Sequence, residues 1–292
     1  MSKINILPHD YEVSIRKFIT KMSEEHNIKD FFPNPLLRDD VLSLLDLFCT
    51  VVYFPVNDAK NNGFHMTDMP FADGSKNNFV FINTAQTIEK QVFTAAHELG
   101  HIWKVDDFVI SDLSLQEAPG LREDIINRFA ATLLIPEDMF KVAVAARFKE
   151  YCDEEERITF INFLKIIVIL MNQFFVPEKA VVFRLVETGF LDTESAEVLL
   201  GYKDIPIDAI ESLIKMLISE FGYVQFQTSL RKKWISGLAE KLDIAEKNNL
   251  VPKEKIEYLR KQFGLHPAKD IAAGMESVLT ITAEKGIKEN VD

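Results

Sequence analysis

The sequence contains few cysteines and no segment resembling a leader. Cys49 and Cys152 lie far apart in a chain of 292 residues and fit no CxxC pattern. A disulfide framework is therefore excluded, and we expect both thiols to behave as small buried hydrophobic groups. The first residues contain no apolar stretch long enough for a secretory signal, so we expect a cytoplasmic protein.

Basic residues are also fewer than acidic residues. The net charge is −12, and the acidic excess falls within the first 200 residues, whereas residues 201–292 are balanced. An acidic surface repels phosphate backbones, so we expect no direct binding of nucleic acid. Hydrophobic residues make up 47 % of the chain and charged residues 27 %. This composition is ordinary for a globular protein and argues against extensive disorder.

No apolar run has the length of a comfortable membrane span. The one stretch that invites this interpretation, residues 160–176, contains Lys165, Asn172 and Gln173. A spanning helix needs about 20 apolar residues. We therefore predict a buried core helix here and no association with a membrane.

The spacing of apolar and turn-forming residues predicts many helices and a few strands. We predict strands over residues 50–54, 63–66 and 78–83, with a polar turn over residues 72–78 between the last two. The key helix is expected to begin near Thr84 or Thr87 and to end near Trp103, followed by a loop. The other predicted helices cover residues 10–27, 40–48, 121–134, 136–148, 158–175, 177–188, 206–221, 229–247, 253–263 and 267–283.

These elements predict an α+β protein in three parts. Residues 1–40 are expected to form an N-terminal helical segment. Residues 41–195 are expected to form a domain in which a small antiparallel sheet packs on a helical core. Residues 196–292 contain only predicted helices and are expected to form an all-helical C-terminal extension or second domain.

The most informative segment is an HExxH motif, His97-Glu98-Leu99-Gly100-His101, on the key helix. His97 and His101 are one turn apart, so both imidazoles can reach one ion. Glu98 lies about 100° around the helix, where it can touch a metal-bound water without ligating the metal. Zinc lowers the pKa of such a water towards ~7, and the glutamate takes its proton as the water attacks a carbonyl. The alternative, a surface helix with incidental histidines, is disfavoured by the apolar character of this helix.

A catalytic zinc ion also needs a third protein ligand and an open position. Glu123 is the best candidate, because it lies on the next predicted helix, after a loop long enough to fold that helix back across the first. Asn127 lies one turn later, where it can accept the outer N–H of a ligating histidine; a solvent-facing position is the alternative. Asp124 points about 100° away from this row, and Glu117 lies in the less rigid loop.

Peptide hydrolysis further requires a donor for the developing oxyanion. His65, on a predicted strand, and Tyr53 are candidate donors. The alternative for His65 is a surface position on its strand, and the general behaviour of isolated histidines favours that alternative.

Three blocks of the sequence resemble the ImmA/IrrE metallopeptidases. The blocks are the strand residues 81–83, the run FTAAHELGH at residues 93–101, and an ExxxN motif at Glu123 that is followed by FAATLLIP. All three occur in the family's order and at similar spacing. The resemblance covers roughly residues 40–190, and it includes an RLxxxG element that begins at Arg184. Ile126 departs from the pattern by replacing a smaller residue, which affects packing more than chemistry.

The resemblance implies a zincin-like, gluzincin-type core with one Zn²⁺ ion per chain on His97, His101 and Glu123, and with Glu98 as the base. Members of the family often cleave or inactivate helix-turn-helix repressors in mobile elements. We therefore expect a regulatory zinc endopeptidase whose substrate is a DNA-binding repressor encoded nearby. The alternative is a regulatory binding protein, such as an anti-repressor or a toxin–antitoxin component, with a structural zinc ion.

Overall fold

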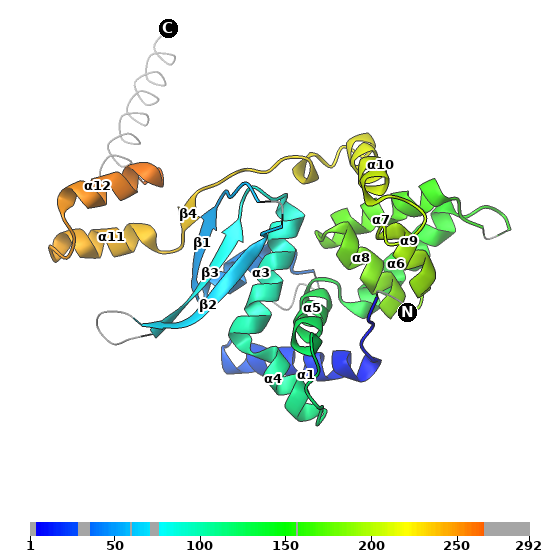
Figure 1. Ribbon diagram of the computed structural model, residues 1–292, viewed down its shortest axis with the longest axis horizontal. Helices are drawn as coiled ribbons and strands as arrows, with labels where there is room; N and C mark the ends of the chain where they lie inside the picture. The colour runs from blue at the N-terminus through cyan, green and yellow to red at the C-terminus, as the bar shows by residue number, and fades with distance from the viewer. Residues whose placement is uncertain (1–3, 29–35, 59, 71–75, 156, 266–292) are drawn as a thin grey trace, which may run out of the picture. The chain divides into compact units, whose positions relative to one another are not determined.

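The protein is described here by a computed structural model, which covers residues 4–28, 36–58, 60–70, 76–155 and 157–265. The chain divides into two compact units, Met1–Lys233 and Trp234–Asp292. The elements of the first unit, in chain order, are α1 (His9–Glu25), α2 (Asp40–Asp46), β1 (Thr50–Phe54), β2 (Gly63–Pro70), β3 (Lys76–Asn83), α3 (Ile88–Trp103), α4 (Val105–Asp112), α5 (Leu121–Leu134), α6 (Glu137–Tyr151), α7 (Phe160–Phe174), α8 (Glu178–Glu187), α9 (Thr193–Leu199), α10 (Ile207–Glu220) and η2 (Val224–Phe226) (Figure 1). The described part of the second unit contains β4 (Trp234–Ile235), α11 (Leu238–Lys247) and α12 (Lys253–Gln262).

The strands of the first unit stand in the order β2-β3-β1. β2 and β3 form an antiparallel hairpin, with His65 opposite Val80, whereas β1 pairs with β3 in parallel. The α+β class is confirmed, but the expectation of a purely antiparallel sheet was wrong. In the sheet, β3 lies between β1 and β2, so the connection from β1 to β2 skips one strand position. The hairpin then reverses the chain, and β3 runs beside β1 in the same direction.

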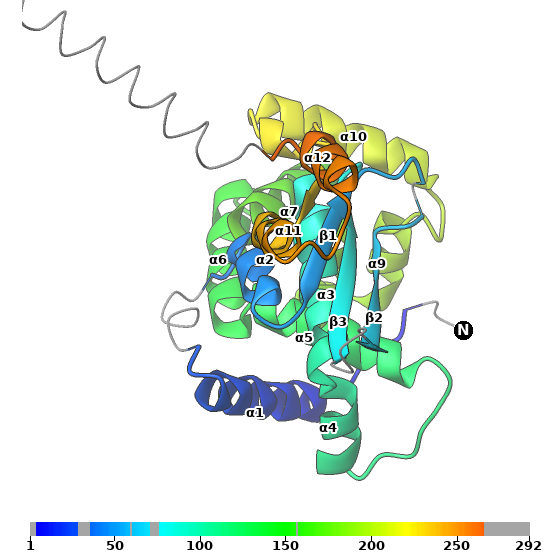
Figure 2. The ribbon, with the colours of Figure 1, turned by 90° about the vertical axis from the view of Figure 1, so that its left-hand side faces the viewer.

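One face of this sheet is covered by α3, which also packs against α2 and α5 (Figure 2). Strand side chains alternate between faces, and Val80 and Ile82 on the α3 side are fully buried. Gly100 permits the close approach of α3 and α5, because a Cβ there would lie 2.8 Å from Cδ1 of Phe129 and 3.2 Å from Cδ1 of Ile126. Ile126, which replaces a smaller residue of the family pattern, thus fills space left by Gly100.

The apolar run predicted as a core helix is α7, which packs against α6, α8 and α10. Most of its side chains are buried within the first unit, as expected. Among the described helices, none alone has both the length and the apolar character of a membrane span. The pair α7 and α8 meets that criterion only when joined, across a bend of 103°.

A buried ion-pair network connects α1, α5 and α8. The carboxylate of Glu12 accepts hydrogen bonds from Arg184 at 2.6 and 2.7 Å and from Arg128 at 2.7 Å. Glu187 lies 2.5 Å from Arg128 and 3.0 Å from Arg184. Burial alone would raise the pKa of Glu12, but the hydrogen bonds and charges of the two arginines outweigh it and hold that pKa far below its ordinary value.

The predicted helices differ from the observed ones in a few places. Two short helices, α4 and α9, were not predicted, and α4 lies where a loop was expected. The predicted helix 229–247 was wrong over its first part, because the backbone N–H of Arg231 bonds the carbonyl of Thr84 and the carbonyl of Lys232 accepts from the Thr84 hydroxyl. The predicted helix 267–283 and most of the predicted turn at 72–78 lie outside the described residues.

The division of the chain also differs from the expected one. The first unit extends to Lys233, beyond the boundary predicted at residue 195, because α10 packs against α7. Helix α1 belongs to the same unit and packs against α4 and α5. The N-terminal segment is therefore part of the scaffold that carries the candidate site.

Candidate metal centre

Two successive helices, α3 and α5, carry the residues of the HExxH and ExxxN motifs. Helix α3 follows Thr87 and ends at Trp103, and the left-handed backbone of the next residue, Lys104 (φ 58°), turns the chain. Gly120, with φ 82°, precedes α5 in the conformation that favours glycine. Ile135 and Pro136 end α5, as predicted, because a proline ring cannot continue the helix.

The crossing of these helices brings His97, His101 and Glu123 together. Nε2 of His97 and Nε2 of His101 are 3.2 Å apart. Oε2 of Glu123 lies 3.5 Å from the His97 nitrogen, and Oε1 of Glu123 lies 3.5 Å from the His101 nitrogen. All three ligand atoms fall within 4.8 Å of one another.

This triangle fits a tetrahedral zinc ion. Bonds of about 2.0–2.1 Å in tetrahedral geometry place ligand atoms about 3.3 Å apart, close to the observed separations. The ligating nitrogens must be unprotonated. Burial, with smaller contributions from His97 and His65, lowers the pKa of His101 to about 4, so this imidazole is neutral at pH 7. The donor set of two imidazoles and one carboxylate also suits zinc.

Asn127 lies where the sequence placed it, against the outer nitrogen of His97. Its Oδ1 is 3.1 Å from Nδ1 of His97. An Nδ1–H that donates to this oxygen leaves the lone pair of Nε2 directed at Glu123 and His101. The competing carboxylates are engaged elsewhere, since Asp124 accepts from Asn5 at 2.7 Å and Glu117 accepts from an arginine.

Glu98 is buried beside this triangle and contacts His65 on β2. Its Oε2 lies 2.7 Å from Nδ1 of His65, and only 5 % of Glu98 is exposed. The ring of His65 stacks on His101 at 4.4 Å between centroids. His65, Glu98 and His101 thus form a second group of ligand atoms that shares a histidine with the first. The interpretation of His65 as an isolated surface residue was wrong, because its partner could not be seen in the sequence.

Tyr53 lies in a different environment. Its side chain is buried in the core from β1, with Asp46 and Cys49 nearby. Burial, together with the charges of these two neighbours, raises the pKa of its hydroxyl well above the ordinary value. Among the described contacts, none joins Tyr53 to either of the two groups of possible metal ligands. In the sheet, β3 separates β1, which carries Tyr53, from β2, which carries His65.

Comparison with known proteins agrees with this arrangement. Residues 46–186 match the IrrE N-terminal-like domain of the M78 peptidases. The matched span runs from the end of α2 to α8 and contains all the residues of the centre. No curated protein matches the chain. The family is one of metallopeptidases, and the structure supplies groups of side chains suited to a metal ion. The resemblance to the ImmA/IrrE family of M78 peptidases is therefore confirmed over residues 46–186.

Proposed function

We propose that the protein is a zinc-dependent endopeptidase in which His97, His101 and Glu123 hold the ion and Glu98 is the catalytic base. The observation that carries this proposal is the convergence of these three side chains, with the two Nε2 atoms 3.2 Å apart and each of them 3.5 Å from one oxygen of Glu123. The buried carboxylate of Glu98 lies outside this group, against His65, whose ring stacks on His101. A purely structural zinc site has no need for such a carboxylate.

The chain's own residues have distinct tasks in this proposal. When bound, zinc supplies Lewis acidity and acidifies a water molecule. Glu98 accepts the proton of the attacking water and later returns it to the leaving amine. His65 donates from Nδ1 to Glu98 and so keeps the carboxylate in place. Because Nδ1 of His65 is directed at Glu98, we assign His65 to positioning that carboxylate.

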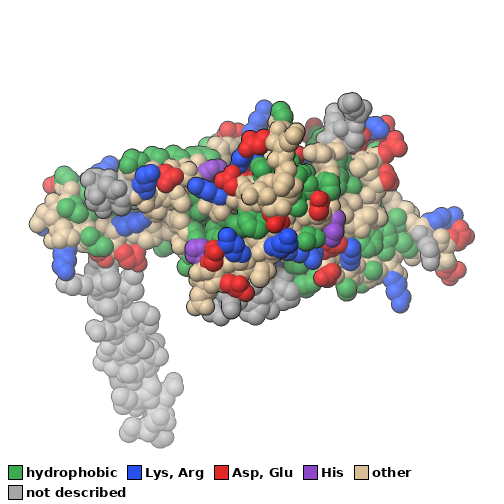
Figure 3. Space-filling view, turned by 90° about the horizontal axis from the view of Figure 1, so that it is seen from below, with side chains coloured by type: hydrophobic (Ala, Val, Ile, Leu, Met, Phe, Trp, Pro, Cys, Tyr) green, Lys and Arg blue, Asp and Glu red, His purple; other side chains and the backbone are tan. Residues whose placement is uncertain are grey.

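The proposed substrate is a DNA-binding repressor encoded near this gene. Its support is the resemblance to regulatory ImmA/IrrE peptidases, together with the net charge of −12, which suits a basic protein partner. On the coloured part of the face in Figure 3, acidic and basic side chains are interspersed. A cytoplasmic location and the absence of direct nucleic-acid binding are part of the same proposal.

The test compares Glu98→Gln with the unchanged protein. Both are expected to contain one zinc ion per chain by elemental analysis, while cleavage of the repressor falls by a factor of about 10² to 10⁴ in the variant. Glu150→Gln, on the surface of α6, is the matched control and should cleave normally. Full processing by Glu98→Gln would overturn the proposal. A stoichiometric effect on an intact repressor, equal in both proteins, would instead establish the regulatory binding protein.

A further inference from the structure

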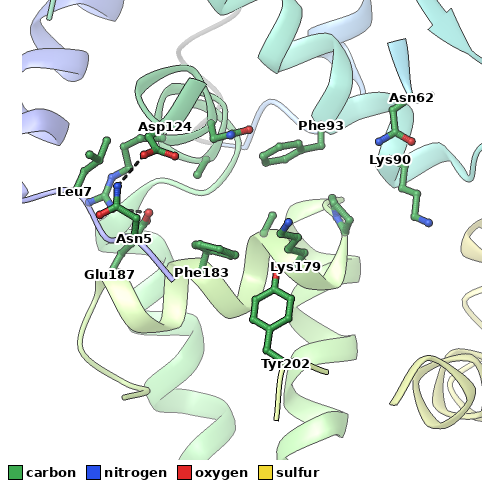
Figure 4. A pocket seen from close by; sticks show the side chains of 15 residues that line it. Asn5, Leu7, Asn62, Lys90, Phe93, Asp124, Lys179, Phe183, Glu187 and Tyr202 are labelled. Carbon is green, nitrogen blue, oxygen red and sulfur yellow. Dashed lines mark hydrogen bonds and ion pairs between the residues drawn. The ribbon is translucent and has the colours of Figure 1, made fainter. Parts of the chain in front are cut away.

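A cavity of about 550 Å³ opens beside the metal centre (Figure 4). Its walls come from α3, α5 and α8, with Phe93 on α3 facing Phe183 on α8 across the opening. We call it the side-chain pocket and define it by six of its lining residues, Lys90, Phe93, Ala131, Lys179, Ala180 and Phe183.

The side-chain pocket begins one helical turn from the ligating histidines. Phe93 precedes His97 by four residues on the same face of α3, and Ala131 follows Asn127 by four on α5. Asn127 itself lines the pocket while its Oδ1 contacts His97. One turn of helix is about 5.4 Å, and an extended peptide advances about 3.3 Å per residue. A side chain in the pocket therefore belongs to a residue at or next to the bond over the metal.

The two ends of the side-chain pocket differ in whether their charged side chains have hydrogen-bond or ion-pair partners within the protein. At one end, Asp124 is bound to Asn5 and Glu187 to Arg128, so their charges are already satisfied. At the other end, Lys90 and Lys179 are exposed, and neither forms an ion pair within the described part of the chain. Lys179 lies over the ring of Phe183, with Nζ 5.7 Å from its centroid.

We propose that the side-chain pocket binds a large apolar side chain of the substrate, directly beside the cleaved bond, and that a neighbouring acidic residue pairs with Lys90 and Lys179. This proposal rests on the proposed peptidase function and names its specificity. The apolar group lies between Phe93 and Phe183 over the small side chains Ala131 and Ala180. The volume lies within the range of about 300–1,000 Å³ that small ligands occupy, which leaves room for a second side chain at the lysine end.

The first experiment reads cleavage sites in a library of proteome-derived peptides digested by the zinc-loaded protein. The expected pattern is an enrichment of Phe, Leu or Met over Gly and Ala of about tenfold at one position beside the cut. Asp or Glu should be enriched one or two positions farther on the same side. Cleavage without any preference at these positions would overturn the proposal.

Variants assign this pattern to the side-chain pocket. Ala180→Phe fills the pocket, and the apolar enrichment should fall below about twofold. Phe183→Ala gives the same result with less steric risk. The double variant Lys90→Glu and Lys179→Glu should remove or reverse the acidic preference, whereas Lys149→Glu, exposed on α6, should keep it. An unchanged pattern in folded pocket variants would locate the specificity elsewhere.

A binding measurement separates this inference from the proposed function. Ligand-detected NMR follows N-acetyl-Phe-Glu-amide and N-acetyl-Ala-Gln-amide with the zinc-loaded Glu98→Gln protein, which does not depend on turnover. The first peptide should bind, the second should not, and Ala180→Phe should abolish binding. Selective binding without any library cleavage would support the pocket and refute the peptidase. Cleavage with equal binding of both peptides would support the peptidase and refute the pocket.

Discussion

Asn127 carries no charge, and in the proposed zinc site it sets which nitrogen of His97 is directed at the ion. Its Oδ1 lies 3.1 Å from Nδ1. Asn127→Ala should lower the affinity for zinc by a factor of about 10 to 100, because the tautomer and ring orientation are then unfixed. Competition with a chromophoric chelator measures this affinity. Asp124→Ala is the matched control on α5, and an equal loss in both variants would contradict the assignment.

Glu178, at the start of α8, links stability to pH. Its Oε1 is buried without a hydrogen-bond partner among the described residues. Burial, followed by the nearby charge of Glu211, raises its pKa to about 7, while Lys90 opposes the shift. Because this pKa exceeds the unfolded value, the folded state binds the proton more tightly, and stability is lost as pH rises from 4.5 through 7.

Glu178→Gln should therefore stabilise the protein at pH 8 by about 1–3 kcal/mol. The gain should shrink towards pH 5, where the glutamate of the unchanged protein is protonated in the folded state. Urea unfolding at both pH values measures the two free energies. A gain of the same size at pH 5 and pH 8 would show that the carboxylate charge is not its cause.

Residue spacing predicted the part of the centre that lies on α3 and α5, but it did not predict the contact made from β2. His97, His101, Glu123 and Asn127 are each one turn from a partner on a regular helix, so the sequence alone places them on common faces. The contact of His65 with Glu98 depends on the register of β2 and on how the sheet meets α3, which no local pattern encodes.

At the scale of elements, the buried ion-pair network around Glu12 connects α1 with α5 and α8. Its carboxylate is fully buried and bound by two arginines that are almost fully buried themselves. Glu12→Ala should lower the free energy of unfolding by about 3–5 kcal/mol, because Glu187 alone then faces two buried arginines and one positive charge is left without a partner. Chemical denaturation measures the loss.

The matched control for this prediction is Glu25→Ala on the same helix. Glu25 is half exposed and lies 3.7 Å from Lys21. A solvent-exposed pair of this kind contributes about 0–1 kcal/mol. Losses of similar size at positions 12 and 25 would mean that α1 contributes through helix content alone.

Helix ends that are marked by a glycine or a proline could be predicted from the sequence. Helices that are stabilised by residues distant in the sequence could not. Helix α5 occupies the predicted residues 121–134, because Gly120 and Pro136 bound it. Helix α4, which begins with Val105, Asp106 and Asp107, lies where the sequence predicts a loop. Arg122, on α5, binds both aspartates, so α4 depends on contacts made across the chain.

At the scale of the whole molecule, the first unit contains every residue of the centre and of the side-chain pocket. Its boundary at Lys233 includes α10, although the family match ends at residue 186. Helix α10 packs on α7 and buries four of its side chains, Ile210, Ile214, Leu217 and Ile218. Burying each such side chain contributes about 1.5–3 kcal/mol, so α10 is a large part of the stability of this unit.

A chain that ends at Lys233 should therefore fold and bind zinc with the affinity of the full protein. A chain that ends at residue 195 exposes the apolar face of α7 and should aggregate or unfold at a lower temperature. Thermal unfolding and zinc content, measured on both chains, make the comparison. Equal stability of the two would show that α10 is dispensable, whereas loss of zinc from the longer chain would show that the centre depends on residues 234–292.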